Sequence, residues 1–319
     1  MKILITVPFT EEQKERLRAQ MPEASYHFTD KVSLTDEEIR EADIILGNVP
    51  VDRLANAQSL KWLQLNYSGA DAYAAEGVLA HEVMLTNATG AYGLAISEHL
   101  LAVTFFLKKK LGRYHRNQMH GQWKDEGQVT AIAGSRTLVI GLGNIGGEYA
   151  RKMSLLGSRV TGIRRTKAAC PEYLDAIGTF EDLERFLPEA DIVAMALPNT
   201  PQTRHIMNAE RLSMMKKGSI LLNVGRGTAI DQDALLHALE SGRLAGASID
   251  VTDPEPLPAD HPLWHCENLL LTPHVAGDYH LQETLDHIVE LFIENLGRYA
   301  KGKELLNPVD RKTGYRRTE

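Results

Sequence analysis

The feature that most constrains the fold of this 319-residue chain is a glycine-rich turn near its middle. The residues Gly141-Leu142-Gly143-Asn144-Ile145-Gly146 follow a short apolar run at 137–140 and precede a helix-forming stretch that reaches about Leu156. A strand, a glycine turn and a helix in this order begin a βαβ unit, and such units build parallel sheets with helices on both faces. The sequence therefore predicts at least one α/β domain.

Short β-rich runs and helix-forming stretches alternate along the rest of the chain. Strands are expected at 3–7, 43–46, 62–65, 83–86, 159–163, 191–197, 219–224, 246–251 and 269–271. Helices are expected at 10–20, 35–41, 181–187, 231–240 and 284–300, with Thr35 and Glu38 at the spacing of a capping box. Since the length suits two domains, the pattern predicts two doubly wound parallel sheets.

A single long helix is expected at 92–117, between the two series of strands, where it could connect the domains. It contains the run Lys108-Lys109-Lys110, which we expect to form a solvated face, because positive charge suits the C-terminal half of a helix.

Composition narrows the class of ligand. A formal net charge of -7 argues against general affinity for nucleic acid or anionic membranes, since both need clustered Lys and Arg. The longest apolar or near-apolar run, residues 100–107, is far shorter than the roughly 20 residues that cross a bilayer. The two cysteines, Cys170 and Cys266, lack the spacing of a zinc site. We expect a cytoplasmic protein with reduced thiols, no metal and a small-molecule ligand.

Each glycine of the turn has a physical role in binding a dinucleotide. Gly141 permits the tight turn, Gly143 lets the backbone approach a pyrophosphate, and Gly146 lets the helix pack on the strand. The pyrophosphate is then expected to lie against free N–H groups at the positive end of the helix, where Asn144 and Ile145 begin it.

The residues after the following strand indicate which dinucleotide binds. A carboxylate about 20 residues beyond the first glycine binds the adenosine ribose in NAD sites, but this chain has Arg164-Arg165-Thr166-Lys167 there. Guanidinium groups bind a 2′-phosphate and stack on adenine, whereas a carboxylate repels that phosphate. We predict a preference for NADP(H). NAD(H) remains the alternative if these arginines are merely exposed loop residues.

Three further segments place reactive side chains directly after predicted strands. Arg226 lies in Asn223-Val224-Gly225-Arg226-Gly227, Glu255 in Asp253-Pro254-Glu255-Pro256, and His274 in Thr272-Pro273-His274-Val275-Ala276-Gly277. Open α/β sheets bind ligands beyond the carboxyl ends of their strands, so the three side chains can converge. Taken singly, Arg226 could cap a turn, Glu255 could be a solvated acid, and His274 could be structural.

These motifs closely resemble the D-isomer-specific 2-hydroxyacid dehydrogenase family. The resemblance extends over nearly the whole chain. Further segments that resemble the family are 90–99, Asn66-Tyr67-Ser68-Gly69-Ala70-Asp71 and Leu197-Pro198-Asn199-Thr200-Pro201-Gln202-Thr203. It implies a flavodoxin-like substrate domain (1–95 and 284–319), an inserted Rossmann-type cofactor domain (96–283), and a cleft that closes on substrate. It also implies a homodimer formed through the inserted domain and its long helix.

The resemblance implies hydride transfer between the dinucleotide and a pair of 2-oxo acid and D-2-hydroxy acid. Arg226 binds the substrate carboxylate and polarises the keto oxygen. His274 protonates that oxygen in reduction and takes the proton back in oxidation, while Glu255 holds the imidazole and favours its charged form. Backbone N–H groups near Ser68 and Gly69 are expected to hold the substrate carboxylate.

Further cofactor contacts follow from the family by position. Asp250 resembles the residue that accepts from the nicotinamide carboxamide, although it could instead be a strand-end cap. Pro198, Asn199 and Thr203 lie where the family wraps the cofactor.

Two alternatives stay open. One is a dehydrogenase of another small anion, such as formate. The formate enzymes have an amide at the position of Glu255, so the carboxylate in this chain argues against that alternative. A dinucleotide-sensing binding protein, like the corepressors of the family, can retain all three reactive residues. Glyoxylate, hydroxypyruvate and larger 2-oxo acids are candidate substrates, and use of NADPH favours the reductive direction.

Overall fold

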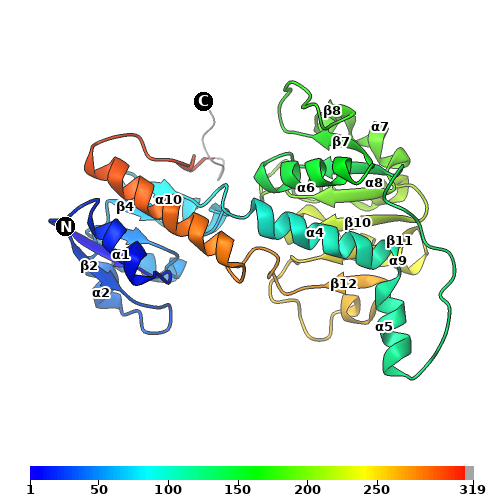
Figure 1. Ribbon diagram of the computed structural model, residues 1–319, viewed down its shortest axis with the longest axis horizontal. Helices are drawn as coiled ribbons and strands as arrows, with labels where there is room; N and C mark the ends of the chain where they lie inside the picture. The colour runs from blue at the N-terminus through cyan, green and yellow to red at the C-terminus, as the bar shows by residue number, and fades with distance from the viewer. Residues whose placement is uncertain (313–319) are drawn as a thin grey trace. The chain divides into compact units, whose positions relative to one another are not determined.

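The computed structural model describes residues 1–312 and divides into two compact units (Figure 1). One unit contains Met1–Tyr92 and the chain from Tyr279 onward, and the other contains Gly93–Asp278. Residues 313–319, the end of the predicted segment 284–319, lie outside the described residues. Across residues 1–312, no helix is both long enough and apolar enough to cross a membrane.

The first unit is built on a parallel sheet with the order β2-β1-β3-β4-β5. Its elements are β1 (Lys2–Ile5), α1 (Glu11–Arg18), β2 (Ser25–Phe28), α2 (Asp36–Glu41), β3 (Ile44–Leu46), η1 (Val51–Asn56), β4 (Trp62–Gln64), α3 (Asp71–Ala74), β5 (Met84–Thr86) and α10 (Gln282–Ala300). A capping box at Thr35 opens α2, as its spacing with Glu38 predicts. α10 lies beside α1 (Figure 1), and the ring of Tyr299 stacks on Trp62 at 5.4 Å.

Within Gly93–Asp278, seven parallel strands form one sheet in the order β12-β11-β10-β9-β6-β7-β8. The strands are β6 (Arg136–Ile140), β7 (Arg159–Ile163), β8 (Ala176–Gly178), β9 (Ile192–Met195), β10 (Ser219–Asn223), β11 (Leu244–Ile249) and β12 (Leu269–Leu271). From β6 the chain moves outward to β7 and β8 and then returns to β9 on the other side of β6. Two parallel, doubly wound sheets confirm the predicted fold class, and the reversal at β6 and β9 marks where such sheets bind ligands.

Helices cover both faces of this sheet. They are α4 (Gly93–Lys108), α5 (Leu111–Met119), α6 (Asn144–Leu155), α7 (Leu183–Phe186), α8 (Ala209–Met214) and α9 (Gln232–Glu240), with short 3-10 turns η2 (Phe180–Asp182), η3 (Leu187–Glu189), η4 (Gly227–Ala229) and η5 (Pro262–His265). α4 and α6 lie side by side (Figure 1).

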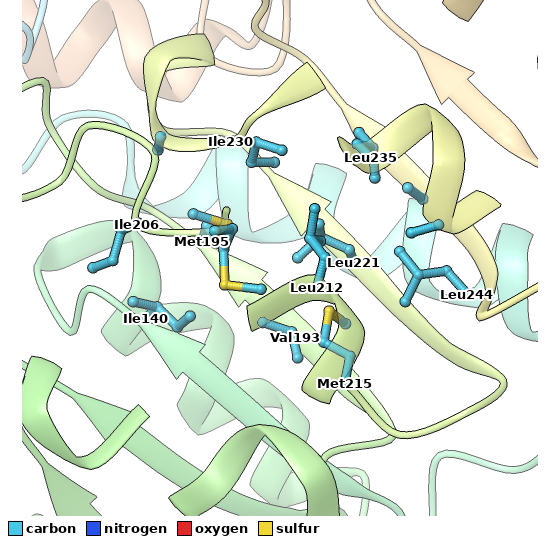
Figure 2. Packing of buried hydrophobic residues seen from close by; sticks show 14 of the residues in the cluster. Ile140, Val193, Met195, Ile206, Leu212, Met215, Leu221, Ile230, Leu235 and Leu244 are labelled. Carbon is cyan, nitrogen blue, oxygen red and sulfur yellow. The ribbon is translucent and has the colours of Figure 1, made fainter. Parts of the chain in front are cut away.

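Apolar side chains at alternate strand positions form the core of the second unit (Figure 2). Val193 and Met195 of β9 share this core with Ile140 of β6 and Leu221 of β10, and they pack with Leu235 of α9. All five are buried. This alternation fixes the register of the strands, because a slip of one residue turns each of these side chains to the other face.

The prediction of one long helix at 92–117 is wrong, because the chain forms two helices there, α4 and α5. α4 ends before Lys110, whose φ of 55° is left-handed. The lysine run is not a solvated face either. Lys108 is buried, and the ammonium groups of Lys109 and Lys110 donate to the carbonyl oxygens of Thr130 (3.2 Å) and Glu126 (2.5 Å). The lysines therefore tie the segment after α5 to α4.

Two strands are absent from the sequence-based prediction, and both lie at sheet edges. β2 has the sequence Ser-Tyr-His-Phe with alternately exposed and half-buried residues, and β8 has only Ala-Ile-Gly. An edge strand pairs on one side only and needs no continuous apolar run, so its sequence signal is weak.

Candidate active site

The three glycines after β6 differ in what surrounds them. A Cβ on Gly141, whose φ is +101°, would lie 2.5 Å from the Ala196 carbonyl oxygen, and one on Gly146 would lie 2.0 Å from the Gly141 carbonyl oxygen. A Cβ on Gly143 would meet no heavy atom within 4 Å. Gly141 and Gly146 are therefore required by internal packing, whereas Gly143 borders open space.

That open space lies at the start of α6. Gly143 is the N-cap residue and α6 has no side-chain cap, so the first N–H groups of the helix, at Asn144 and Ile145, have no intrahelical acceptor. The Asn144 side chain lies against Gly93 of α4, where a Cβ would be 2.6 Å from its Oδ1. Donors at the positive end of a helix beside open space fit the phosphates of a dinucleotide.

The chain beyond β7 carries Arg164 and Arg165, both exposed. The Arg164 N–H donates to the Gly178 carbonyl oxygen at 3.0 Å, which extends the pairing of β7 with β8 by one residue. No carboxylate occupies positions 164–167. The end of β7 thus presents positive charge where an NAD site needs an acid.

The loop beyond β9 is held together by Thr203. Its buried hydroxyl donates to the Pro198 carbonyl oxygen at 2.7 Å and accepts from the Thr200 N–H at 2.9 Å. Asn199 is exposed, and its Oδ1 accepts from the Thr228 hydroxyl at 3.0 Å. Thr203, one of the three predicted cofactor residues of this loop, thus uses its hydroxyl to hold the loop together.

Arg226 lies between two glycines because the backbone on each side is in close contact with other chain segments. A Cβ on Gly225 would lie 2.4 Å from the Leu197 carbonyl oxygen, and one on Gly227 would lie 2.0 Å from that of Thr252. The half-buried guanidinium also donates to the Gly225 carbonyl oxygen at 2.9 Å. The position of Arg226 is therefore set by the ends of β9 and β11.

His274 and Glu255 form a hydrogen-bonded pair. Nδ1 of His274 is 2.9 Å from Oε2 of Glu255, whose Oε1 accepts from the Thr252 N–H at 2.9 Å. Because a carboxylate accepts, Nδ1 carries a proton and Nε2 is left as the nitrogen that can exchange one. The two side chains are 50% and 38% exposed. Since Thr252 also contacts Gly227, the turns carrying Glu255 and Arg226 are packed together.

Asp250 holds the segment that carries His274. Its buried carboxylate accepts from the Thr272 hydroxyl at 2.6 Å and from the Val275 and Ala276 N–H groups at 3.0 Å each. Its carbonyl oxygen accepts from the His274 N–H at 2.8 Å. These bonds keep His274 at a left-handed φ of 52°, which costs a non-glycine residue roughly 1–2 kcal/mol. Asp250 thus caps the end of its strand, which is one of the two roles that the sequence allows. Its contact with the nicotinamide carboxamide stays a prediction.

Two residues that position the site are missing from the sequence-based prediction. Asn223 accepts from the Gly225 N–H and donates to the Arg226 carbonyl oxygen, both at 3.0 Å. Gln232, the first residue of α9, donates to the Asp253 carbonyl oxygen at 2.7 Å and accepts from the Asp253 N–H at 3.1 Å. Asn223 could be suspected from its place at the end of a strand, whereas nothing in the sequence links Gln232 to residue 253.

Ser68 and Gly69, the predicted substrate contacts of the first unit, lie in the loop after β4. The Ser68 carbonyl oxygen accepts from Nδ2 of Asn87 at 2.7 Å, and the Tyr92 hydroxyl donates to the Asn66 carbonyl oxygen at 2.5 Å. The loop is thus held from within its own unit, and its part in binding substrate stays a prediction.

Known proteins are similar to this chain in sequence and fold. The family model for the NAD binding domain of the D-isomer specific 2-hydroxyacid dehydrogenases matches residues 101–276, more than half of the chain. The glyoxylate reductase of Korarchaeum cryptofilum is 33% identical over 230 residues, which cover 69% of this chain and 67% of that protein.

Two solved structures of this family are each 30% identical to the chain. The superposition on the protein from Aeromonas salmonicida covers 97% of this chain and 99% of that protein, with a TM-score of 0.86. The superposition on the dehydrogenase from Xanthobacter autotrophicus, in complex with NADPH and MES, covers 98% of this chain and 99% of that protein, with a TM-score of 0.81. These matches confirm the resemblance carried by the motifs. The chain therefore belongs to the D-isomer specific 2-hydroxyacid dehydrogenase family and is an NAD(P)-dependent dehydrogenase of 2-hydroxy acids.

Proposed function

We propose that this enzyme reduces a small 2-oxo acid to the D-2-hydroxy acid, with NADPH as the preferred reductant. The observation that carries the proposal is the His274–Glu255 pair at 2.9 Å, on a turn packed against the one that bears Arg226. Reduction of a 2-oxo acid needs a proton donor for the keto oxygen and a cation for the carboxylate, and these residues supply both.

Each of the three residues has a defined task in this proposal. Arg226 binds the substrate carboxylate and polarises the keto oxygen through its planar guanidinium. When bound, the nicotinamide supplies the hydride. His274 gives the proton on Nε2 to the keto oxygen, and Glu255 keeps the ring oriented through Nδ1. Ser68 and Gly69 enter the proposal from the sequence alone, as contacts of the substrate carboxylate.

The test is an assay of glyoxylate, hydroxypyruvate, pyruvate and longer 2-oxo acids with NADPH and with NADH. The similarity to a glyoxylate reductase supports a short substrate and the reductive direction. We expect the highest kcat/KM for a short 2-oxo acid with NADPH and a D-configured product. Cofactor binding without turnover of any acid would favour a dinucleotide-sensing protein instead.

The preference for NADPH is expected to depend on the arginines after β7, as the sequence and the NADPH-bound relative suggest. Replacing Arg164 and Arg165 together by Ser should lower kcat/KM for NADPH by about 10- to 100-fold, the range for losing charge-assisted hydrogen bonds. The value for NADH should change little. Arg159, at the other end of β7 and also exposed, gives a control as Arg159→Ser. Equal losses with both cofactors would contradict this assignment.

The glycine turn offers a second cofactor test, because two of its glycines should fail in different ways. Gly143→Ala adds a methyl group into open space, so the melting temperature should hold while the Kd for NADPH rises by about tenfold or more through contact with the phosphates. Gly146→Ala meets the Gly141 carbonyl oxygen at 2.0 Å and should lower the melting temperature. Calorimetry of binding and of unfolding checks both. An unchanged Kd in Gly143→Ala would remove the pyrophosphate from this turn.

The remaining assignments belong to the same proposal. We retain Pro198, Asn199, Thr203 and Asp250 as cofactor-binding residues, 96–283 as the cofactor domain, and 1–95 with 284–319 as the substrate domain. We also retain the cytoplasmic location and the homodimer. Exposed apolar side chains on α5 and just after it support association: Leu111 is 47%, Met119 70% and Trp123 105% exposed.

A further inference from the structure

The loop after β4 is anchored to its unit through successive carbonyl oxygens. Three of them accept hydrogen bonds: that of Asn66 from the Tyr92 hydroxyl (2.5 Å), that of Tyr67 from the Ala88 N–H (2.9 Å), and that of Ser68 from Nδ2 of Asn87 (2.7 Å). By contrast, the N–H groups of Ser68 and Gly69 have no hydrogen-bond acceptor among residues 1–312. Backbone donors without a partner in the protein are available to a ligand, and adjacent ones suit an anion.

The peptide group between Ser68 and Gly69 links these two observations. It contains both the Ser68 carbonyl oxygen, which accepts from Asn87, and the Gly69 N–H. Because a trans peptide group is planar, its C=O and N–H bonds point in opposite directions. The hydrogen bond from Asn87 to the oxygen therefore fixes the direction of the Gly69 N–H.

The side chain of Asn87 is itself held in one orientation. Asn87 directly follows β5 and is 2% exposed. While its Nδ2 donates to Ser68, its Oδ1 accepts from the Thr89 N–H at 3.2 Å. Rotation of the amide would break both bonds and bury unpaired polar atoms, which is costly.

Asn307, from the segment after α10, binds the backbone on both sides of this side chain. Its Nδ2 donates to the carbonyl oxygens of Asn87 at 3.3 Å and Thr89 at 2.7 Å, and its own carbonyl oxygen accepts from the Asn87 N–H at 3.2 Å. Asn307 is 7% exposed and has a left-handed φ of 55°, which Asn adopts more readily than most residues. Asn307 thus closes the turn that presents Asn87.

The backbone of Asn307 does not depend on its side chain for its position. The chain around it runs antiparallel to β5, an edge strand, with a bridge between Thr86 and Pro308. The Val309 N–H donates to the Leu85 carbonyl oxygen at 2.9 Å. These contacts remain when the side chain at 307 is replaced, so its donors can be removed while the segment stays in place.

We propose that Asn307 and Asn87 are positioning residues that act in series to aim the Gly69 N–H at the carboxylate of the 2-oxo acid. The inference rests on the proposed function, which assigns this carboxylate to Ser68 and Gly69. It gives the segment after α10 a part in substrate binding, although neither asparagine contacts the substrate.

Two substitutions test the series. Asn307→Gly keeps the left-handed backbone and removes both donors, and Asn87→Asp keeps the shape of the side chain but sets an acceptor against the Ser68 carbonyl oxygen. We expect KM for the 2-oxo acid to rise by about tenfold in each, the scale for weakening a hydrogen bond to a charged group. Since the loop binds the carboxylate equally before and during reduction, kcat should stay within about twofold, and so should the Kd for NADPH.

Tyr26→Phe is the matched control for lost stability. It removes a hydroxyl that donates to the Met21 carbonyl oxygen at 2.9 Å, and it lies on β2, at the opposite edge of the same sheet from β5. All three variants should lower the melting temperature, because each loses a hydrogen bond. Only Asn307→Gly and Asn87→Asp should raise KM.

Amide hydrogen exchange reports on the loop without turnover. The Ala88 N–H is bonded to the Tyr67 carbonyl oxygen, so its exchange should quicken when the loop separates from residue 88 more often. We expect faster exchange at Ala88 in Asn307→Gly and in Asn87→Asp, and unchanged exchange in Tyr26→Phe.

The inference is overturned if KM stays within twofold of the wild type in Asn307→Gly and Asn87→Asp, or if Tyr26→Phe raises KM as much as they do. A wild type that reduces no 2-oxo acid contradicts the proposed function instead. In that case the exchange at Ala88 still decides whether the two asparagines hold the loop, and unchanged exchange refutes it.

Discussion

Replacing His274 by Asn is expected to lower kcat by about 10³-fold, within the usual contribution of general acid–base catalysis, while NADPH binds as before. Asn keeps an N–H near the position of Nδ1, which bonds Glu255 in the wild type at 2.9 Å, and has nothing at the position of Nε2. The variant thus retains the partner of Glu255 and loses only the exchangeable proton. Asn also tolerates the left-handed backbone at this position, φ 52°. Stopped-flow reduction and calorimetry of NADPH binding measure the two quantities.

His265 gives the matched control for this experiment. It is an exposed histidine of the same unit, at the end of η5, and it has no hydrogen bond to Glu255 or Asp250. His265→Asn should leave kcat within about twofold of the wild type, as surface substitutions away from a site usually do. If His274→Asn retains a tenth or more of the wild-type kcat, another group supplies the proton.

Arg226→Lys is expected to lower kcat/KM for the 2-oxo acid by about 10²- to 10³-fold, comparable with the loss of a donor that stabilises a developing oxyanion. The positive charge remains, but a Lys ammonium is a point charge and cannot replace a planar fork that bonds two oxygens at once. The neighbouring turn cannot move to compensate, since Gly225 and Gly227 are in tight contact with Leu197 and Thr252. Steady-state kinetics with saturating NADPH measure the loss.

Arg204→Lys controls for the chemistry of the substitution. Arg204 is an exposed arginine of the same unit, with its guanidinium 3.9 Å from the carboxylate of Asp253, close to Glu255 in the sequence. Because exposed ion pairs contribute little, its kcat/KM should stay within about twofold. If the two variants behave alike, Arg226 does not bind the substrate.

The features that the sequence predicts well are those encoded within a few neighbouring residues. The glycine turn, the capping box at Thr35 and the alternation of strands with helices each follow from local spacing, and the structure contains them. The pairing of His274 with Glu255 also agrees with the sequence, because both follow strands whose carboxyl ends must meet at one edge.

The features that the sequence does not predict depend on contacts between distant segments. The break at Lys110 follows the bonding of the lysines to the chain at 126–130, which no periodicity records. The bonds of Gln232 to Asp253 join residues on either side of β11. Such pairs emerge only when the sheet brings its strand ends together.

The two glycines beside Arg226 bear on how the specificity of this enzyme can be changed in the laboratory. Any side chain at 225 or 227 would overlap the backbone of Leu197 or Thr252, so randomising these codons yields mainly misfolded clones. Under the proposed role of Ser68 in binding substrate, mutant libraries aimed at new 2-oxo acids are better spent on the preceding residue, Tyr67, which is 38% exposed. The reactive turns can then stay constant while the preference for a substrate side chain is selected.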